Sequence, residues 1–553
     1  MKNRIKQYLL AASMCVGLTA CSDFFEPIPG VQFGLDETFA SKQRTEEYLN
    51  NVYSYVREVT DAIHPNTYGG IFTEASLDGA NRWNKTYAEW TNGSFNSASA
   101  QASEYFSKYY QAIAKASTFI QNVDKCTEAA ASTRGKWKSE ARALRAYYYF
   151  ELLRLYGPIP LIGEDPIPLD ASLEELIKER NSVDECVNFI ATELQSAIDS
   201  GDLLQRAGKA NLGRMDVATC MALKAKLYLY WASPLFNGNT DQASVKNKDG
   251  KQLFPQTEDN SKWAQARDAY ERFMTFATGQ GYKLTEVYTN GKLDPYASCR
   301  AAGEFFTTTW EAVDELIFVK LRDLYDYTYW VCPKFTDFQD TDVTDGGDYY
   351  TTQETVDLFF TKDGLTIEED PGYDKFEGIP SANNFTSGRY YDPNNPSRLY
   401  FDADKSKVLK QWKDREPRFY VNITYSGSIW LNEGKYNEEM RTDFTNGANG
   451  TCGKSKASGD CPDSGYLIRR GAKASNNNGS KHFSPVLRLA DMYLGYAEAL
   501  CMCSDLDNAL TYLNKIRVRA GIPEYTFTAT SRQNNLSEDT DRSAEPYPPR
   551  TFG

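Results

Sequence analysis

The chain has 553 residues and a formal net charge of -14 at pH 7, with 75 acidic residues against 61 lysines and arginines. This acidic balance repels phosphate backbones, and no stripe of basic residues interleaved with aromatic ones opposes it, so nucleic acid is excluded as a ligand. The length would allow several domains, but no long low-complexity linker interrupts residues 36–523, and we expect one large domain there.

The first twenty residues have the three parts of a secretory signal peptide. Basic residues open the chain, an apolar run spans residues 8–16, and small residues stand directly before Cys21. The apolar run is too short to span a bilayer, and no later window holds eighteen uninterrupted apolar residues. We therefore expect residues 1–20 to be removed, Cys21 to carry lipid, and residues 21–35 to form a tether to the membrane.

Apolar residues recur at three- and four-residue steps through most of the first half, which predicts helices. These helices are expected near residues 37–59, 101–125, 136–156, 184–200, 213–236 and 261–278. The third has a clear end, because Gly157 permits a left-handed turn and Pro158 cannot continue a helix. Two of the predicted starts lie about one tetratricopeptide period apart, so we expect paired, stacked helices, although no motif repeats.

From about residue 291 to 480 the composition shifts toward glycine, asparagine, aspartate, serine and tyrosine, and turn signals interrupt the helical pattern. Residues 418–425 and 429–430 resemble two short strands around a turn. Helix is expected to return at 485–520. The sequence thus predicts a mainly α fold: a helical scaffold, about 36–290 and 485–520, with a loop-rich insert that contains a few short strands.

Enzymatic motifs are missing from this sequence. Its two histidines stand in no nucleophile or metal pattern, and there is no phosphate-binding loop or nucleophile elbow. A glycosidase needs only two carboxylates at the correct separation, so a surface glycoside hydrolase is the least favoured alternative. We expect a protein that is not an enzyme and that has no metal and no cofactor.

The cysteines fit structural roles better than metal binding, since none has paired CxxC spacing. Cys501 and Cys503 fall in a helical pattern where residues two apart point in different directions, and we expect them to be small core residues. Cys452 and Cys461 flank a short Gly/Lys/Ser-containing loop, and a disulfide between them is compatible with an oxidising compartment.

Three blocks of sequence carry a family resemblance. They are SEARALRAYYYFEL at 139–152 followed by LYGPIPL at 155–161, ALKAKLYLY at 222–230, and LRLADMYLGYAEA at 487–499 leading into LNKIRVRAGIP at 513–523. In this order, behind a lipoprotein signal, they resemble the SusD/RagB family of outer-membrane nutrient-binding lipoproteins. The resemblance covers most of residues 21–523.

The resemblance implies a helical scaffold of tetratricopeptide-like pairs, anchored in the outer membrane by its N-terminal lipid and facing the cell exterior. It also implies a partner, a SusC-like TonB-dependent transporter, on which the protein would sit as a lid. The ligand it implies is a glycan, an oligo- or polysaccharide. A RagB-like relative that captures peptides in a deeper cavity is the alternative.

The C-terminal tail departs from the family pattern. Family members continue past the Ala-Gly-Ile-Pro turn into further helices, whereas residues 524–553 are polar and irregular, and the proline-rich segment 545–549 cannot form a helix. We interpret this tail as truncated or frameshifted relative to the family, and we expect it to leave apolar helix faces uncovered.

Glycans need exposed aromatic platforms for the apolar faces of sugar rings and polar side chains for the hydroxyl rims. Two turn-prone stretches supply both kinds of side chain, and the glycan surface of SusD relatives comes from loops in about these two regions. The predicted ligand-binding residues are Asp78, Asn81, Arg82, Trp83, Tyr87 and Trp90 in the first loop, and Tyr327, Tyr329 and Trp330 in the second. Packing in the core is the alternative role for each aromatic residue.

Overall fold

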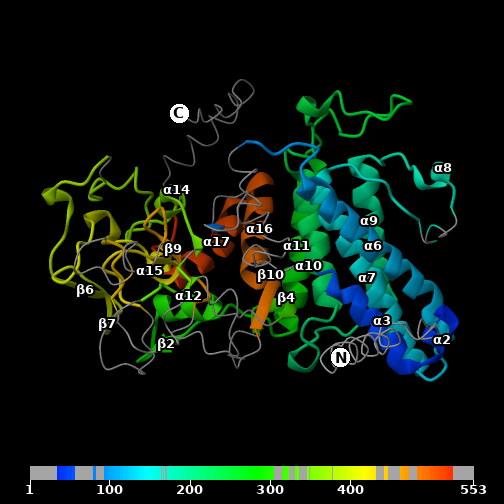
Figure 1. The fold of residues 1–553 in the computed structure, drawn as a ribbon, viewed down its shortest axis with the longest axis horizontal. Coiled ribbons are helices and arrows are strands. Elements are labelled where there is room, and N and C mark those ends of the chain that lie inside the picture. The colour runs from blue at the N-terminus through cyan, green and yellow to red at the C-terminus, as the bar shows by residue number, and fades with distance from the viewer. Residues whose placement is uncertain are drawn as a thin grey trace, which may run out of the picture.

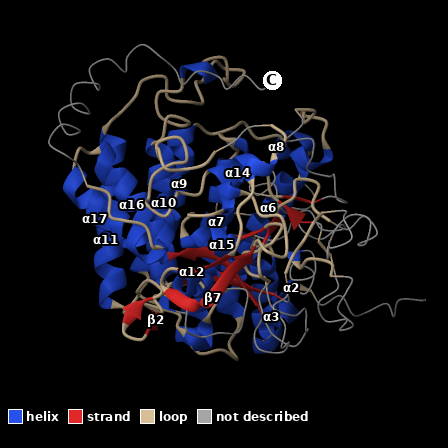
Figure 2. Ribbon diagram, turned by 90° about the vertical axis from the view of Figure 1, so that its left-hand side faces the viewer, coloured by secondary structure: helices blue, strands red, loops and turns tan. Residues whose placement is uncertain are grey.

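The fold is known from a computed structural model of the chain. It describes residues 34–56, 79–81, 93–163, 165, 167, 171–303, 314–322, 331–335, 346–347, 349–375, 378–430, 441–445, 452, 461–472 and 482–526. Within them, helices dominate and strands are short and few, as Figure 2 shows. The predicted mainly α fold is therefore confirmed.

One region of the molecule is a stack of helices. Its members are α2 (Leu35–Ala40), α3 (Lys42–Ser54), α6 (Ala100–Asn122), α7 (Ala131–Tyr156), α8 (Leu173–Leu176), α9 (Val183–Asp199), α10 (Val217–Ala232), α11 (Ser261–Gly279), α16 (Leu489–Met502) and α17 (Leu506–Ala520). The long helices pack on their neighbours in chain order, from α6 on α7 through to α16 on α17. Figure 1 shows them side by side, as expected of stacked helix pairs.

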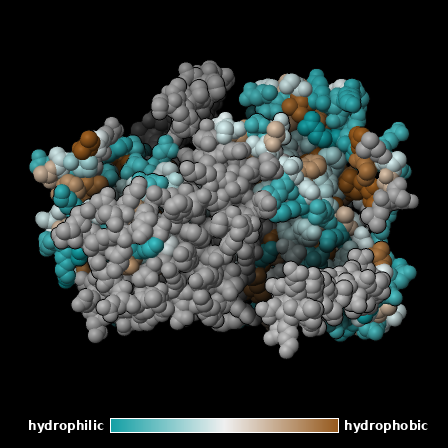
Figure 3. All heavy atoms as spheres, viewed as in Figure 1, coloured by the Kyte–Doolittle hydropathy of each residue, from teal (hydrophilic) through white to brown (hydrophobic). Residues whose placement is uncertain are grey.

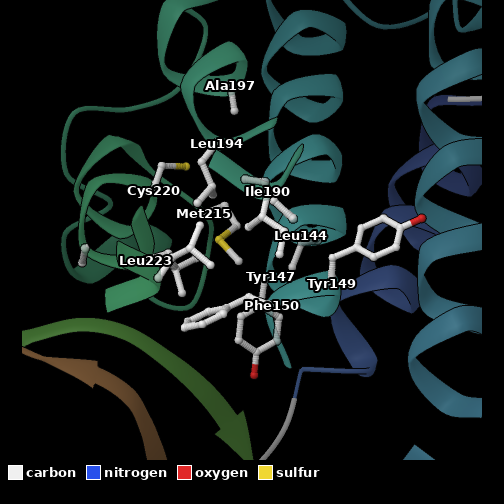
Figure 4. Close-up of a cluster of buried hydrophobic side chains, with 14 of the residues drawn as sticks. Leu144, Tyr147, Tyr149, Phe150, Ile190, Leu194, Ala197, Met215, Cys220 and Leu223 are labelled. Atoms are coloured by element: carbon white, nitrogen blue, oxygen red, sulfur yellow. The ribbon is translucent and has the colours of Figure 1, made fainter. Parts of the chain in front are cut away.

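The core of this stack forms around α7, which is buried on almost every side. Figure 4 shows its Leu144, Tyr147 and Phe150 among side chains of α9 and α10, such as Ile190 and Leu223. The first family block, 139–152, therefore supplies the centre of the helical core. Burial of such side chains stabilises a fold by about 2 kcal/mol each.

A charged residue of that block is structural as well. Arg145 is fully buried, and its Nε donates to Glu193 Oε2 of α9 at 2.7 Å while its Nη1 donates to Ser117 Oγ of α6 at 3.0 Å. A buried charge requires such partners, because desolvation without them costs several kcal/mol, on the order of 3–5 when one partner is removed. Arg145 thus links three helices.

The other region holds a second core in shorter elements. Its helices are α12 (Pro295–Gly303), α14 (Gln353–Asp357) and α15 (Pro417–Asn422). Short 3-10 turns occur in both regions: η2 (Val123–Lys125), η3 (Lys209–Asn211), η4 (Thr240–Gln242), η8 (Ala382–Asn384) and η9 (Lys410–Trp412). The second core gathers aromatic rings from distant segments, and the rings of Tyr400 and Tyr420 stack with their centroids 3.9 Å apart.

The described strands form one small four-stranded sheet and three two-stranded pairs. The antiparallel sheet has the order β1 (Ala80–Asn81), β5 (Tyr349–Tyr350), β9 (Leu467–Ile468), β8 (Ile423–Thr424). The pairs are β2 (Tyr288–Thr289) with β3 (Lys292–Leu293), β6 (Arg389–Asp392) with β7 (Asn395–Asp402), and β4 (Leu316–Arg322) with β10 (His482–Arg488). Because β4 and β10 are far apart in sequence, their pairing joins the start and the end of the loop-rich segment.

The structure corrects three local predictions. The helix predicted at 37–59 is two helices, which meet at the extended residue Ser41, and the second ends at Ser54. Residues 485–488 are strand and not helix, because pairing with β4 overrides the local pattern. Residues 418–422 are helix and not strand, since Pro417 fixes a helical first turn that packs against α12.

The cysteine predictions have mixed outcomes. Cys501 is exposed and Cys503 is only half-buried, so placing them in the core was wrong; they lie at the C-terminal end of α16, where the adjacent Met502 is exposed too. Cys452 and Cys461 are both buried. Their pairing stays a prediction.

The described surface has few apolar areas. Figure 3 shows it as mostly hydrophilic on this face, with hydrophobic atoms gathered toward the outer end of the helical stack. Leu176 and Ile177, at the end of α8, are among the exposed apolar residues. Among the described helices, none combines the length and the apolar character that crossing a bilayer requires.

Candidate functional site

Most of the predicted site residues lie outside the described part of the chain. These residues are Cys21, Asp78, Arg82, Trp83, Tyr87, Trp90, Tyr327, Tyr329 and Trp330. For Asn81 the backbone alone is described: it lies in β1 and pairs with Tyr349 of β5. Contact of these residues with a ligand therefore stays a prediction, and the structure instead shows where the two loops are attached.

The aromatic residues of the first predicted loop follow Asn81 of β1. The segment that leads to β1 begins after Val56, just after α3, and the segment that contains the second loop follows Arg322 at the end of β4. Lys320 of β4 joins these two points, because its Nζ donates to the carbonyl oxygens of Ser54 at 2.7 Å and Val56 at 2.6 Å. The C-terminal end of a helix favours such a cation, since its last carbonyl groups have no partner within the helix.

Both loops are also anchored close to their aromatic residues. Asn81 is held at the edge of the four-stranded sheet by the pairing of β1 with β5. Val331 and Cys332, which directly follow Trp330, are buried. Each predicted loop is thus fixed to the scaffold immediately beside its aromatic residues, and such support is what a preorganised binding surface requires.

A groove of about 630 Å³ lies beside Val56 and β4, where the segment that leads to β1 and the second loop segment begin. Its lining combines an aromatic ring, amides and charges of both signs with apolar side chains, and includes Glu46, Asn50, Tyr53, Asn211, Arg214, Phe318, Lys320 and Leu321. Ligand sites for sugars need this mixture, because a sugar ring has an apolar face and a polar rim.

The polar side of this groove is rigidly built. The hydroxyl of Tyr53 donates to Glu140 Oε2 at 2.8 Å and accepts from the backbone N–H of Met215 at 2.9 Å. The guanidinium of Arg214 lies over the Tyr53 ring, 5.0 Å from its centroid, and forms ion pairs with Glu46 at 3.3 Å and with Glu140 at 3.4 Å. Arg214 is therefore held in one orientation at the groove.

Burial dominates the electrostatics behind the groove. It raises the pKa of the Glu140 carboxyl, and the positive charge of Arg214 opposes this shift. Burial also raises the pKa of Tyr53, with the Glu140 carboxylate adding to the effect. Tyr53 therefore keeps its proton as a hydrogen-bond donor at ordinary pH.

The groove residues Tyr53, Arg214 and Lys320 were not predicted from the sequence. They come from three segments that meet only in the folded protein. One signal did exist: Lys320 is the single charged residue in the apolar run 316–321. A lone lysine in a strand of that kind must find partners for its charge.

Metal binding finds no support in the described residues. No cluster of three or more histidine, cysteine, aspartate or glutamate side chains within the described ranges has the arrangement that a metal ion requires.

Comparison with known protein families shows to which family the chain is related. Residues 32–229 match a family described as "Starch-binding associating with outer membrane", and residues 315–544 match the SusD family. The chain belongs to the SusD/RagB family. The two matches contain the three sequence blocks on which the resemblance was based, except Tyr230 at the end of the second block, and the second match continues into the tail, to residue 544.

Relatives of this SusD/RagB chain are distant in sequence. A SusD-like protein of Bacteroides ovatus is 27% identical over 175 residues, which are 30% of this chain and 30% of that protein. The aligned part is thus less than a third of the relative's length.

Solved structures of the family share the fold over most of the chain. The protein BT4246 has a TM-score of 0.69 at 23% identity, covering 89% of this chain and 84% of its own. A SusD-like protein of Bacteroides fragilis, BF3747, has a TM-score of 0.63 at 20% identity, covering 92% and 84%. The surface glycan-binding protein A of Bacteroides uniformis has a TM-score of 0.52 at 15% identity, covering 90% and 84%.

Proposed function

We propose that this SusD/RagB protein captures a glycan at the cell surface and passes it to a SusC-like TonB-dependent transporter in the outer membrane. Lipid on Cys21 would hold it there, with the binding surface facing outward. The protein would bind its ligand without cutting it. One family description names starch binding and outer-membrane association, and one structural neighbour is named as a glycan-binding protein, which supports this proposal.

The observation that carries the proposal is the groove between α3 and β4, beside the segments that lead to the two aromatic loops. Lys320 ties the start of the segment that leads to β1 to the end of β4, from which the second loop follows, and Tyr53 and Arg214 supply a ring and a cation in the groove. Aromatic residues from both loops would stack on sugar rings, while the groove would hydrogen-bond the hydroxyl groups. Binding along a surface suits a polymer, which is too long for a closed cavity.

Affinity electrophoresis tests this function. The protein from Ser22 onward would run through gels that contain plant, host or microbial polysaccharides, beside Trp83→Ala and Trp330→Ala variants. Retardation by at least one polysaccharide is expected, and both variants should lose most of it. Tyr288→Ala is the matched control, because Tyr288 is an exposed aromatic residue on the β2 hairpin, outside the groove lining.

A folded protein that no polysaccharide retards would contradict glycan capture. Binding of a peptide pool by the same protein, lost in the two tryptophan variants, would replace glycan with peptide as the ligand.

A further inference from the structure

A separate pocket of about 280 Å³ opens in the loop-rich region, and it shares no lining residue with the groove. Two loop segments form it, residues 362–374 after α14 and residues 410–414 before α15, together with Thr386. We propose that this pocket is a second subsite, which binds a single neutral hexose residue of the glycan. This inference rests on the proposed function, because it assigns a further contact to the same class of ligand.

The base of the pocket is rigid. Tyr373 donates its hydroxyl to the carbonyl of Gln411 at 2.6 Å and accepts from Arg415 Nη1 at 2.6 Å. The buried Arg415 in turn donates from Nη2 to the carbonyl oxygens of Val356 and Phe359, at 2.6 and 2.7 Å. The Tyr373 ring is thereby fixed at the wall of the pocket, with the Arg415 guanidinium 5.2 Å from its centroid.

The backbone at the pocket is specialised too. Asp414 adopts a left-handed conformation, with φ of 57°, which few residues other than glycine adopt. Its carbonyl accepts from the N–H of Lys362 at 2.8 Å, and its Oδ1 accepts from the Tyr390 hydroxyl at 3.1 Å. The bond from Lys362 joins the two segments of the pocket, and the bond from Tyr390 holds the Asp414 carboxylate in place.

The charges of the lining select the kind of ligand. Two lysines are neutralised locally, since Lys362 pairs with Asp363 at 2.8 Å and Lys410 pairs with Asp374 at 3.1 Å. Two further carboxylates, Asp370 and Asp414, and one further ammonium group, Lys413, remain in the lining.

A neutral polyhydroxy ring matches this set. Each sugar hydroxyl both donates and accepts, so it satisfies a carboxylate and an ammonium group equally well. An acidic sugar would instead meet an excess of carboxylates, which opposes its binding. The volume lies just below that of common ligand pockets, about 300–1,000 Å³, which fits one ring and not a chain.

Saturation-transfer NMR with defined sugars tests the pocket. The probes are the methyl glycosides of glucose, galactose and mannose, with methyl glucuronide as the acidic counterpart, at millimolar concentration. The protein is the chain from Ser22 onward with Trp83→Ala and Trp330→Ala, which removes the aromatic platforms of the proposed main surface. We expect a signal from at least one neutral glycoside and a signal at least fivefold weaker from the glucuronide.

Two variants and one control locate that signal. Asp414→Asn keeps the shape and tolerates the left-handed backbone while it removes the charge, and Lys413→Gln removes the ammonium group. Each should reduce the signal at least fivefold. Lys407→Gln is the matched control, because Lys407 lies shortly before the segment 410–414, over the ring of Phe385 and outside the lining, and it should leave the signal unchanged.

The subsite would be overturned if a folded protein gave no signal from any neutral glycoside. Equal signals in Asp414→Asn and the parent protein would overturn it too. A signal that EDTA abolishes would also overturn it, because the pocket would then be a cation site. Failure of the proposed main binding surface would be seen in a separate measurement, because polysaccharides would then not retard the protein that keeps both tryptophans.

Discussion

The helical region around α7 and the loop-rich region around Tyr420 both bury large aromatic side chains, but different contacts hold them together. In the helical region, apolar faces of neighbouring helices meet, and residues close in sequence share one face. In the loop-rich region, rings from distant segments stack, and the buried Arg415 donates to the backbone carbonyl oxygens of Val356 and Phe359 at the end of α14. Regular helices satisfy their own backbone, whereas irregular loops need side chains to do so.

The largest effect is expected where the helical region is densest. Leu144 is fully buried between α7 and α9, and its truncation leaves a cavity that rigid helices cannot fill. Leu144→Ala should lower the free energy of unfolding by about 3–5 kcal/mol, measured by urea denaturation. Leu235→Ala is the control, since Leu235 is more than half exposed, and it should cost less than about 0.5 kcal/mol. Equal losses of unfolding free energy in Leu144→Ala and Leu235→Ala would contradict the conclusion that apolar burial dominates the stability of the helical region.

A smaller but more local effect is expected in the loop-rich region. Arg415→Met removes the donor to the Val356 and Phe359 carbonyl oxygens and to Tyr373, and should cost about 3 kcal/mol. Limited proteolysis should then cut within residues 349–430 while the helical stack stays intact. The half-buried Arg267, paired with its neighbour Asp268, gives the control Arg267→Met, which should change stability by less than about 1 kcal/mol. Simultaneous loss of both regions would show that they unfold as one unit.

Close packing of helices gives the third test. A Cβ at Gly495 of α16 would lie 2.6 Å from Cζ of Tyr270, a buried residue of α11 that stacks on Tyr496. Gly495→Ala should therefore cost about 2 kcal/mol in thermal or chemical unfolding. At Gly279, the last residue of α11, a Cβ meets open space, so Gly279→Ala should be neutral or slightly stabilising. A neutral Gly495→Ala would mean that α11 and α16 separate easily.

The smallest effect concerns a carboxyl group at the start of α10. Asp216 accepts from the N–H groups of Thr219 and Ala207, both at 2.7 Å, yet burial outweighs these bonds and raises its pKa to about 6 from 3.8. Between these values the folded protein holds a proton that the unfolded chain has lost. The resulting stabilisation is complete below the unfolded pKa and is lost as the pH rises through about 6.

Stability relative to Asp216→Asn should therefore increase by about 1 kcal/mol when the pH falls from 7 to 5. Urea denaturation of both proteins at the two pH values measures this difference. A difference that does not change with pH would show that the Asp216 carboxyl is solvated in the folded protein.

Prediction from the sequence succeeded where the determining contacts are local. The helical period located α3, α6, α7, α9, α10 and α11, although it merged α2 with α3 and missed the short α8, and Gly157 and Pro158 marked the end of α7. It failed at β10, whose partner β4 lies far away in the chain, and at α15, where a proline and packing against α12 outweigh strand propensity.

For the site, composition identified two aromatic loops, and their contact with a ligand stays a prediction. The groove beside them could not be predicted, because Tyr53, Arg214 and Lys320 become neighbours only through the fold. The same holds for the pocket around Asp414, whose two segments are joined by a backbone bond from Lys362.

The bonds from Lys320 to the carbonyl oxygens of Ser54 and Val56 bear on how such proteins diversify. They fix the end of α3 and the end of β4 relative to each other, whatever sequence follows either of them. Insertions, deletions or wholesale exchange of either loop would then alter the recognised nutrient without disturbing the helices that carry it. Proteins that keep these hydrogen bonds can acquire new ligand specificities by loop replacement, while the helical scaffold stays under ordinary selection for stability.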